Sequence, residues 1–234
     1  MKRSVKYGRS LIEYDLAFSD RKTLGIKVHP DKSVQVIAPT DSPIEKINEK
    51  IRTKASWILK QQAFFLSFYP LTTQRKYISG ETHLYLGKQY RLMLIQSAEE
   101  SVKLYSGYIT VSCADPSNRK RVKALLGKWY SDKAKIHFQS LFDHWISAIT
   151  PPTKQPATLI YKWMSDKWGR CNNQYQITLN IKLIQAPKKC IEYVIVHEIC
   201  HLTHLNHSKS FYQLLQQHYP DWRRTKQQLE TFMA

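Results

Sequence analysis

The stretch that decides how the chain is interpreted reads HEICHLTHLNH and covers residues 197–207. Two histidines four residues apart, His197 and His201, lie on one face of a helix and can share a metal ion. Glu198 directly follows the first histidine, so its carboxylate can reach a water molecule bound to that metal. This is the HExxH arrangement of zinc hydrolases. The stretch therefore predicts a helix that carries a hydrolytic metal site.

A third ligand is expected, because catalytic zinc sites generally use three protein ligands and leave one position for water. His204 lies seven residues after His197, about 10.5 Å farther along a straight helix, and one ion cannot easily reach both rings. His207 can join the site only if the chain turns back. Asn206, just before it, tolerates the left-handed conformation that ends helices. We therefore favour His207 over His204, which would lie at the rim of the site or support a ligand.

Together these residues predict one Zn²⁺ ion held by His197, His201 and His207, with Glu198 as the catalytic base. The alternative is a structural zinc site, which needs a fourth protein ligand. The nearest cysteine, Cys200, is adjacent to His201, and a cysteine in this position is more often a small core residue. We therefore expect a catalytic rather than a structural site.

The composition is that of a strongly basic globular protein. The chain has 234 residues and a net charge of +18, enough material for one large domain or two small ones. Both halves are basic. Such a field favours anionic partners, namely nucleic acid, nucleotides, anionic lipid or acidic proteins. The plainer interpretation is a basic protein without a partner of this kind.

The cysteines and the N-terminus indicate the compartment. The four cysteines contain no CxxC pair, which is typical of reduced thiols in the cytoplasm. The first residues, MKRSVKYGRS, are not followed by a long apolar run. We therefore expect neither a signal peptide nor a membrane span, and we expect a cytoplasmic protein without a membrane partner.

Hydrophobic periodicity predicts an α+β fold. Strands are expected over 10–18, 23–29, 34–38, 158–164 and 174–183, a β-meander over 75–112, and helices over 208–218 and 221–232. We expect a β-rich N-terminal part with one long helix over residues 1–115. A zincin-like catalytic domain, with a small sheet and an active-site helix, is expected over residues 116–234.

A basic run is expected at the start of a long helix that follows Asp115-Pro116. It consists of Arg119, Lys120, Arg121 and Lys123. These side chains could bind phosphate groups. A solvated helix face is the more ordinary interpretation of such a run.

Several short motifs around the metal helix match a family of known proteins. They are WGRC at 168–171, Asn180, LIQAP at 183–187, HEICH at 197–201, NHS at 206–208 and Phe211. With these motifs the chain resembles the YgjP-like metallopeptidase domain, a zincin-type family related to SprT-like proteins. The resemblance implies zinc held by the three histidines, Glu198 as the base, and metallopeptidase activity. Members of the family have also been associated with pyrophosphatase activity on UTP, which implies nucleotide hydrolysis as the alternative.

The resemblance also identifies residues around the expected metal. Trp168, Arg170, Asn180 and His204 are candidates to contact the substrate or to support the metal ligands. Arg170 stands where serine is usual in the family, and it adds a positive charge beside the expected cleft.

Three functions remain open. In the first, a zinc peptidase, the expected strand at 174–183 could pair with an extended peptide beside the metal, although a strand already buried in the sheet is an equally ordinary interpretation. In the second, the metal site hydrolyses a nucleoside triphosphate such as UTP and releases pyrophosphate. Side chains would then hold the phosphates, because the chain has no P-loop. The third is a basic nucleic-acid-binding module with a structural metal. We favour the peptidase.

Overall fold

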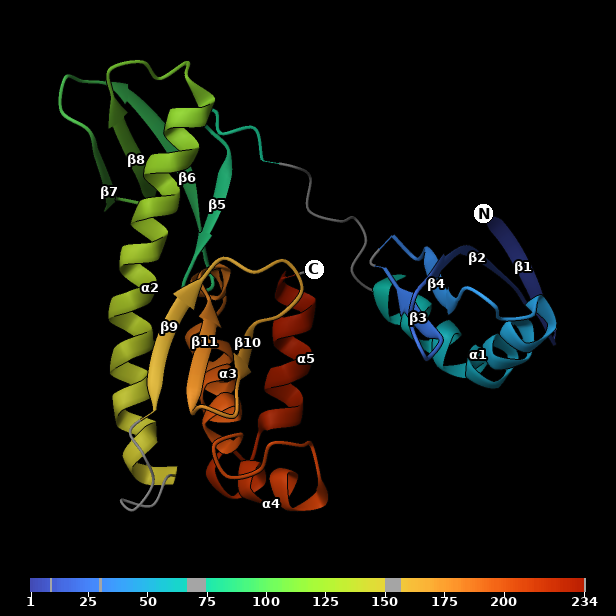
Figure 1. The fold of residues 1–234 in the computed structure, drawn as a ribbon. Coiled ribbons are helices and arrows are strands. Elements are labelled where there is room, and N and C mark those ends of the chain that lie inside the picture. Colours follow the sequence, from blue (N-terminus) through green and yellow to red (C-terminus); the bar gives the residue numbers. More distant parts are fainter. Residues whose placement is uncertain (9, 30, 67–74, 150–156, 234) are drawn as a thin grey trace. The chain divides into compact units, whose positions relative to one another are not determined.

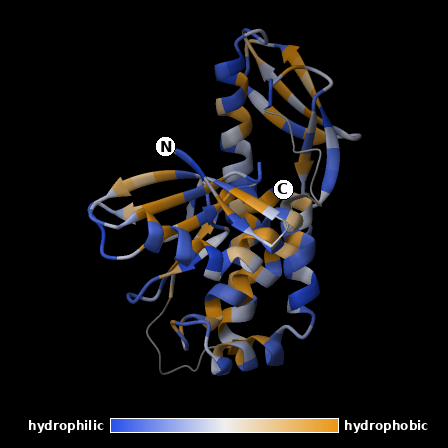
Figure 2. Ribbon diagram, turned by 90° about the vertical axis from the view of Figure 1, so that its right-hand side faces the viewer, coloured by the Kyte–Doolittle hydropathy of each residue, from blue (hydrophilic) through white to orange (hydrophobic). Residues whose placement is uncertain are grey.

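The computed structural model describes residues 1–8, 10–29, 31–66, 75–149 and 157–233 (Figure 1). Helices and strands occur in separate stretches of the chain, so the expected α+β class is confirmed. The described residues up to 66 form one compact unit and those from 75 to 233 form another. Orange and blue segments alternate along many elements in Figure 2, as expected where one face of an element is buried. None of the described helices combines the length and apolar character that a membrane span requires.

The first unit is a four-stranded sheet covered by one helix. Its elements are β1 (Lys2–Tyr7), β2 (Ser10–Ser19), β3 (Gly25–Val28), β4 (Val34–Pro39) and α1 (Ile44–Leu66). Ile47, Ile51 and Ile58 recur at helical spacing and pack on alternate residues of the strands. The sequence pattern did not predict β1, because only Val5 of this strand is buried and the strand lies at the sheet edge.

The second unit contains a four-stranded sheet, a three-stranded sheet and the remaining helices. Its first elements are β5 (Thr82–Tyr85), β6 (Lys88–Gln96), β7 (Ser101–Tyr105), β8 (Tyr108–Cys113) and α2 (Arg119–Ile149). They are followed by β9 (Thr158–Lys162), β10 (Gly169–Cys171), β11 (Gln176–Asn180), the 3₁₀ helix η1 (Ile181–Gln185), α3 (Lys188–Cys200), α4 (Lys209–His218) and α5 (Trp222–Met233). The last two helices lie where the sequence predicts them.

The two four-stranded sheets share one topology. The strand orders are β1-β2-β4-β3 and β5-β6-β8-β7, and each sheet is followed by a long helix. In each sheet the second and fourth strands are parallel and the outer pairs are antiparallel. The meander expected over 75–112 is therefore wrong, because β8 lies between β6 and β7. Ile109 and Val111 of β8 are fully buried, which suits a central strand, whereas β7 is mostly exposed.

The first strands of the second unit share a hydrophobic core with the metal helix. One cluster of buried side chains runs from Tyr85 and Leu92 through α2 to Ile195 and Leu229. Residues 75–113 consequently belong to the same compact unit as the C-terminal residues. The expected boundary after residue 115 lies inside this unit. Local sequence patterns did not indicate this, because the contacts that hold the unit together join residues distant in sequence.

The tight turn between β5 and β6 packs against the residues just before α3. Leu86 and Gly87 both have positive φ, at 50° and 80°, as a two-residue hairpin turn requires. Their amides donate to the carbonyl groups of Ile184 and Gln185, at 2.9 and 3.1 Å. A Cβ atom on Gly87 would lie 2.8 Å from the Cα atom of Pro187. Glycine is therefore needed here for close contact as well as for its conformation.

Replacing Gly87 with alanine should lower the free energy of unfolding more than replacing Gly107. Both glycines have positive φ, but a Cβ atom on Gly107 meets nothing within 4 Å. Both variants should lose about 1–2 kcal/mol from left-handed backbone strain, and Gly87→Ala should lose more because the turn must move away from α3. Urea unfolding of the two variants measures the difference. Equal losses would show that the contact with Pro187 adds nothing.

Candidate metal centre

Helix α3 places the HEICH segment at the edge of the hydrophobic core. Nine of its thirteen residues are buried, so the helix is held by packing on most sides. The helix begins after its N-cap residue Pro187 and ends with His201 as its C-cap. His201 is 9% exposed and Glu198 is 6% exposed. Polar groups are this deeply buried in proteins mainly where they have a partner or a function.

The chain turns back after α3, as His207 requires. The amide of His204 donates to the carbonyl of Cys200 at 3.0 Å and closes the last turn of the helix. Ser208 then caps α4, because its hydroxyl accepts from the amide of Phe211 at 3.3 Å. Helix α4 therefore begins directly after His207 and returns this residue to the end of α3.

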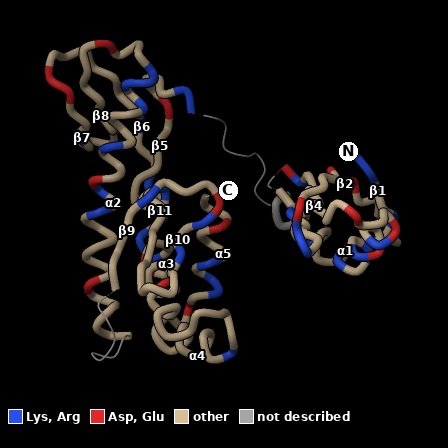
Figure 3. Tube along the Cα trace, viewed as in Figure 1, with Lys and Arg blue, Asp and Glu red and all other residues tan. Residues whose placement is uncertain are grey.

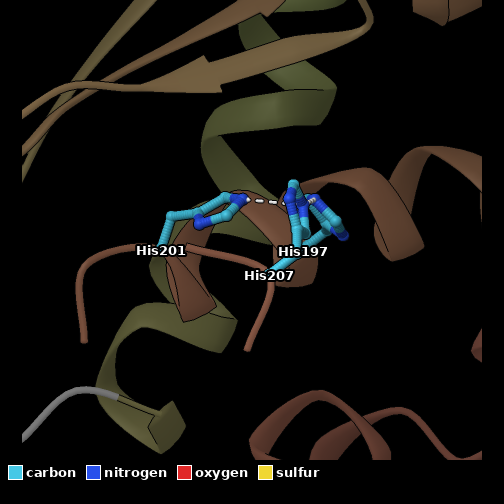
Figure 4. A group of neighbouring side chains, drawn as sticks. All are labelled: His197, His201 and His207. Carbon is cyan, nitrogen blue, oxygen red and sulfur yellow. Dashed lines mark hydrogen bonds between the residues drawn. The ribbon is translucent and has the colours of Figure 1, made fainter. Parts of the chain in front are cut away.

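The three imidazole rings point their Nε2 atoms at one another (Figure 4). The Nε2 atom of His207 lies 3.2 Å from that of His201 and 3.0 Å from that of His197. All three nitrogens lie within 4.8 Å of one another, and this group can hold a metal ion. A tetrahedral zinc 2.0–2.1 Å from each nitrogen would separate them by about 3.3 Å, so the spacing fits such an ion.

Hydrogen bonding also favours a cation at this point. The Nδ1 atom of His201 lies 2.9 Å from the carbonyl oxygen of His204, which can only accept, so Nδ1 carries the proton. In the neutral ring, Nε2 of His201 then presents a lone pair, which is the form that binds metals. No tautomer of His207 satisfies its contacts with both neighbours well, because its Nε2 atom has one proton at most. A metal ion would satisfy all three lone pairs.

Burial favours the neutral form of His197 and His201. Burial, together with His201 and His207, lowers the pKa of His197 to about 3, and burial also lowers the pKa of His201. Neutral imidazole is the ligand form for metals. Among the buried side-chain nitrogen and oxygen atoms of the described residues, only Nδ1 of His197 lacks a hydrogen-bond partner. A buried atom of this kind is tolerated mainly at functional sites.

Phe211 forms an aromatic floor beneath the three histidines. Its fully buried ring lies 5.0, 4.5 and 4.8 Å from the rings of His197, His201 and His207, measured between centroids. Tyr212 stacks on the outer face of His207 at 6.0 Å. The packing restricts the rings to the orientation in which their Nε2 atoms converge.

Glu198 directly follows His197 in α3, and its side chain contacts the edge strand β10. A Cβ atom on Gly169 would lie 2.6 Å from Oε1 of Glu198, so only glycine leaves room for the carboxylate. Burial raises the pKa of Glu198 to about 8, and the nearby Lys167 acts in the opposite direction. A bound divalent cation would lower this pKa, since it favours the charged carboxylate. A carboxylate beside a three-histidine group is the combination that hydrolytic zinc centres use.

The other predicted site residues have different positions. His204 supports the group through its backbone carbonyl, which accepts from His201. Trp168 is half-buried, with Nζ of Lys182 5.9 Å from its ring centroid. Arg170 is exposed in the middle of β10. None of these side chains belongs to the three-histidine group.

Asn180 is a brace for the loop before β10. Its buried amide donates to the carbonyl groups of Met164 and Lys167 at 2.9 and 2.8 Å, and its oxygen accepts from the amide of Lys182 at 3.0 Å. Through these hydrogen bonds Asn180 positions β10. This strand contains Gly169, the residue in contact with Glu198.

Sequence reasoning named Phe211 as part of a motif but did not identify its contact with all three histidines, nor the contact between Gly169 and Glu198. The signal for Phe211 is its place three residues after the capping Ser208, on the first turn of a helix that must return to the metal. No local signal indicates the contact at Gly169, because its partner is 29 residues away.

Of the two cysteines near the site, Cys200 is a core residue and Cys171 is half-buried. Cys200 is fully buried, and burial raises its pKa to about 12. Burial and the charge of Glu198 raise the pKa of Cys171 to about 11. Thiolate is the form that binds metals. Within the described part of the chain, the one group of metal-ligating side chains that meets this geometry contains histidines alone.

A comparison with models of protein families identifies one family. The family model described as YgjP-like, metallopeptidase domain, matches residues 22–232. Among solved structures, the chain is similar to the metallopeptidase zymogen of Pyrococcus abyssi abylysin, with 22% identity over 38% of this chain and 87% of that chain, at a TM-score of 0.34. It is also similar to the zymogen of Methanocaldococcus jannaschii jannalysin, with 14% identity over 38% and 84%, at a TM-score of 0.34. No curated protein matches the sequence.

Replacing His207 should remove metal binding, whereas replacing His204 should largely preserve it. His207→Ala takes away one of three converging nitrogens, while His204 contributes its backbone carbonyl, which alanine retains. Metal content after dialysis, measured by inductively coupled plasma mass spectrometry, distinguishes the variants. We expect close to one metal per chain for His204→Ala and a large loss for His207→Ala. The opposite result would make His204 the third ligand.

Proposed function

The chain belongs to the family of YgjP-like metallopeptidase domains, and from this premise we propose that it is a zinc-dependent peptidase. In this proposal His197, His201 and His207 hold the zinc ion and Glu198 is the general base. The observation that carries it is the convergence of three imidazoles, with the buried carboxylate of Glu198 next to His197 in the chain. Three protein ligands leave a tetrahedral ion one position for water or substrate, which is typical of catalytic rather than structural zinc.

The proposed role of each group follows from its chemistry. When bound, zinc lowers the pKa of water and polarises a carbonyl group. The Glu198 carboxylate accepts the proton of the attacking water and then delivers it to the leaving peptide nitrogen. Burial of Glu198 limits its exchange of protons with solvent, and Gly169 allows the carboxylate to stay on the side of the helix that faces β10.

Strand β10 is the element that best fits an extended peptide. The sequence pattern pointed instead to the strand expected at 174–183, but β11 is paired on both edges, with β10 and with β9. The other interpretation of this stretch, a strand buried in the sheet, is therefore confirmed. Among the described strands, β10 pairs only with β11, so its other edge is free to bind a peptide by strand addition. A peptide on that edge would pass Gly169, the residue in contact with Glu198.

Replacing Glu198 with glutamine should abolish peptide cleavage without removing the metal. The amide keeps the size of the side chain but cannot accept the proton, and loss of a general base typically costs about 10²–10⁴ in rate. Cleavage of unfolded protein substrates by the zinc-loaded variant measures the effect. A matched control is Glu192→Gln on the same helix, whose side chain accepts from Nε1 of Trp145 at 3.0 Å. The glutamine oxygen can still accept there, so this variant should remain active.

The same proteins, incubated with UTP and assayed for pyrophosphate, test nucleotide hydrolysis. Metal-dependent release of pyrophosphate that is lost in Glu198→Gln, without cleavage of any peptide, would replace the peptidase by a nucleotide pyrophosphatase. Unchanged peptide cleavage in Glu198→Gln would contradict the assigned role of this residue.

A further inference from the structure

A strongly basic hollow lies at the start of α2. It has a volume of about 330 Å³ and is lined by Arg75, Lys76, Tyr77, Arg119, Lys120 and Lys123, which we call the basic pocket. Lys and Arg are spread over both units (Figure 3), but here they converge from two segments far apart in the sequence. Three of its lining residues belong to the start of α2. This end of α2 lies beside the four-stranded sheet, opposite to α4 (Figure 1). The pocket is therefore separate from the three histidines.

The positive charges of the pocket have no acidic partners. None of its six lining residues is acidic. Among the described residues, none of its five cations forms an ion pair, whereas the adjacent Arg121 pairs with Glu100. Lys123 lies over an aromatic face, with its Nζ atom 5.8 Å from the ring centroid of Tyr77. Uncompensated cations around a hollow attract an anionic ligand.

The helix direction adds to this positive field. The N-terminal end of a helix carries a partial positive charge that favours acidic residues and disfavours basic ones. Helix α1 follows this rule with Glu45 in its first turn, whereas the first turn of α2 has no acidic residue and begins with Arg119 and Lys120. A bound anion would offset both the dipole and the repulsion among the side chains.

The second segment of the pocket is held in place by Glu81. Its carboxylate accepts from the amides of Lys76 and Tyr77, at 2.7 and 2.9 Å, and contacts Nε2 of the buried His83 at 2.9 Å. Arg75 donates to the carbonyl of Thr82. The hydrogen bonds of Glu81 therefore go to the backbone and to His83. They hold this segment so that its cations line the hollow. Such preorganisation lowers the cost of binding a ligand.

We propose that the basic pocket binds a compact anion with several phosphate groups. A carboxylate supplies one negative charge, whereas a phosphate group supplies up to about two and presents three acceptor oxygens. Five cations around about 330 Å³ therefore match linked phosphates better than an acidic peptide. Arginine and lysine are the side chains that bind phosphate oxygens. The hollow and the contribution of residues 75–77 distinguish this site from a solvated helix face.

Inorganic triphosphate is the probe that tests this proposal. Isothermal titration calorimetry of the full chain should detect binding, and Lys120→Glu with Lys123→Glu should weaken it at least about tenfold, because two attractive charges become repulsive. Both side chains are exposed, and glutamate suits the first turn of a helix, so the variant should fold. Its peptidase activity should equal that of the wild type.

The matched control carries Lys135→Glu and Lys189→Glu, which change the net charge equally at exposed positions outside the pocket. Lys135 lies about 18 Å beyond Lys123 along α2, more than the Debye length of about 8 Å at physiological salt. The control should bind triphosphate with an affinity close to that of the wild type. An equal loss in both variants would show that the general charge of the protein is responsible and would overturn the proposal.

Three further outcomes contradict the proposal. The first is an absence of triphosphate binding by the wild type at physiological salt. The second is binding that survives in the Lys120→Glu/Lys123→Glu variant and disappears in His207→Ala, which would place the anion at the metal centre. The third is binding of single-stranded oligodeoxythymidylate, but not of triphosphate, that is lost in the Lys120→Glu/Lys123→Glu variant. That result would make the ligand a nucleic-acid strand.

Discussion

The packing of three imidazole rings around Phe211 is the contact on which the metal centre depends. The ring of Phe211 is fully buried and lies within 5.0 Å of each histidine ring, measured between centroids. Two of the histidines come from α3, and the third comes from the loop that precedes α4. Because Phe211 belongs to the first turn of α4, the contact that orients the rings also fixes the return of the chain. The orientation of the three rings and the packing of the helices thus depend on the same side chain.

Two glycine contacts hold α3 against the sheets of its unit. Gly87 lies against Pro187 at the start of the helix, and Gly169 lies against Glu198 near its end. The first contact comes from the four-stranded sheet and the second from the three-stranded sheet. Both sheets therefore determine where the metal helix lies, which explains why residues 75–113 form one unit with the C-terminal residues. The unit that holds the candidate site is larger than the HExxH segment and its flanking helices.

Local patterns in the sequence were sufficient to predict the helices and the histidine group at the candidate metal centre. The spacing of His197, His201 and His207 and the helix expected from residue 208 each depend on residues only a few positions apart. The left-handed conformation expected at Asn206 is absent, since this residue has no positive φ and α3 already ends at Cys200. Features that depend on distant contacts were not predictable in this way. The parallel pairing of β6 with β8 joins strands separated by a hairpin, and the shared core joins Tyr85 to α3. Asn180 was expected near the substrate, yet its hydrogen bonds brace a loop 13–16 residues away.

X-ray absorption spectroscopy of the zinc-loaded protein tests the central claim most directly. If three histidines hold one ion with an open position, the spectrum should show nitrogen and oxygen neighbours at about 2.0–2.1 Å, with outer scattering from three imidazole rings. A sulfur neighbour at about 2.3 Å would instead place a cysteine in the site. A fourth imidazole would likewise indicate a closed structural centre. Either result would contradict a catalytic zinc site built from His197, His201 and His207.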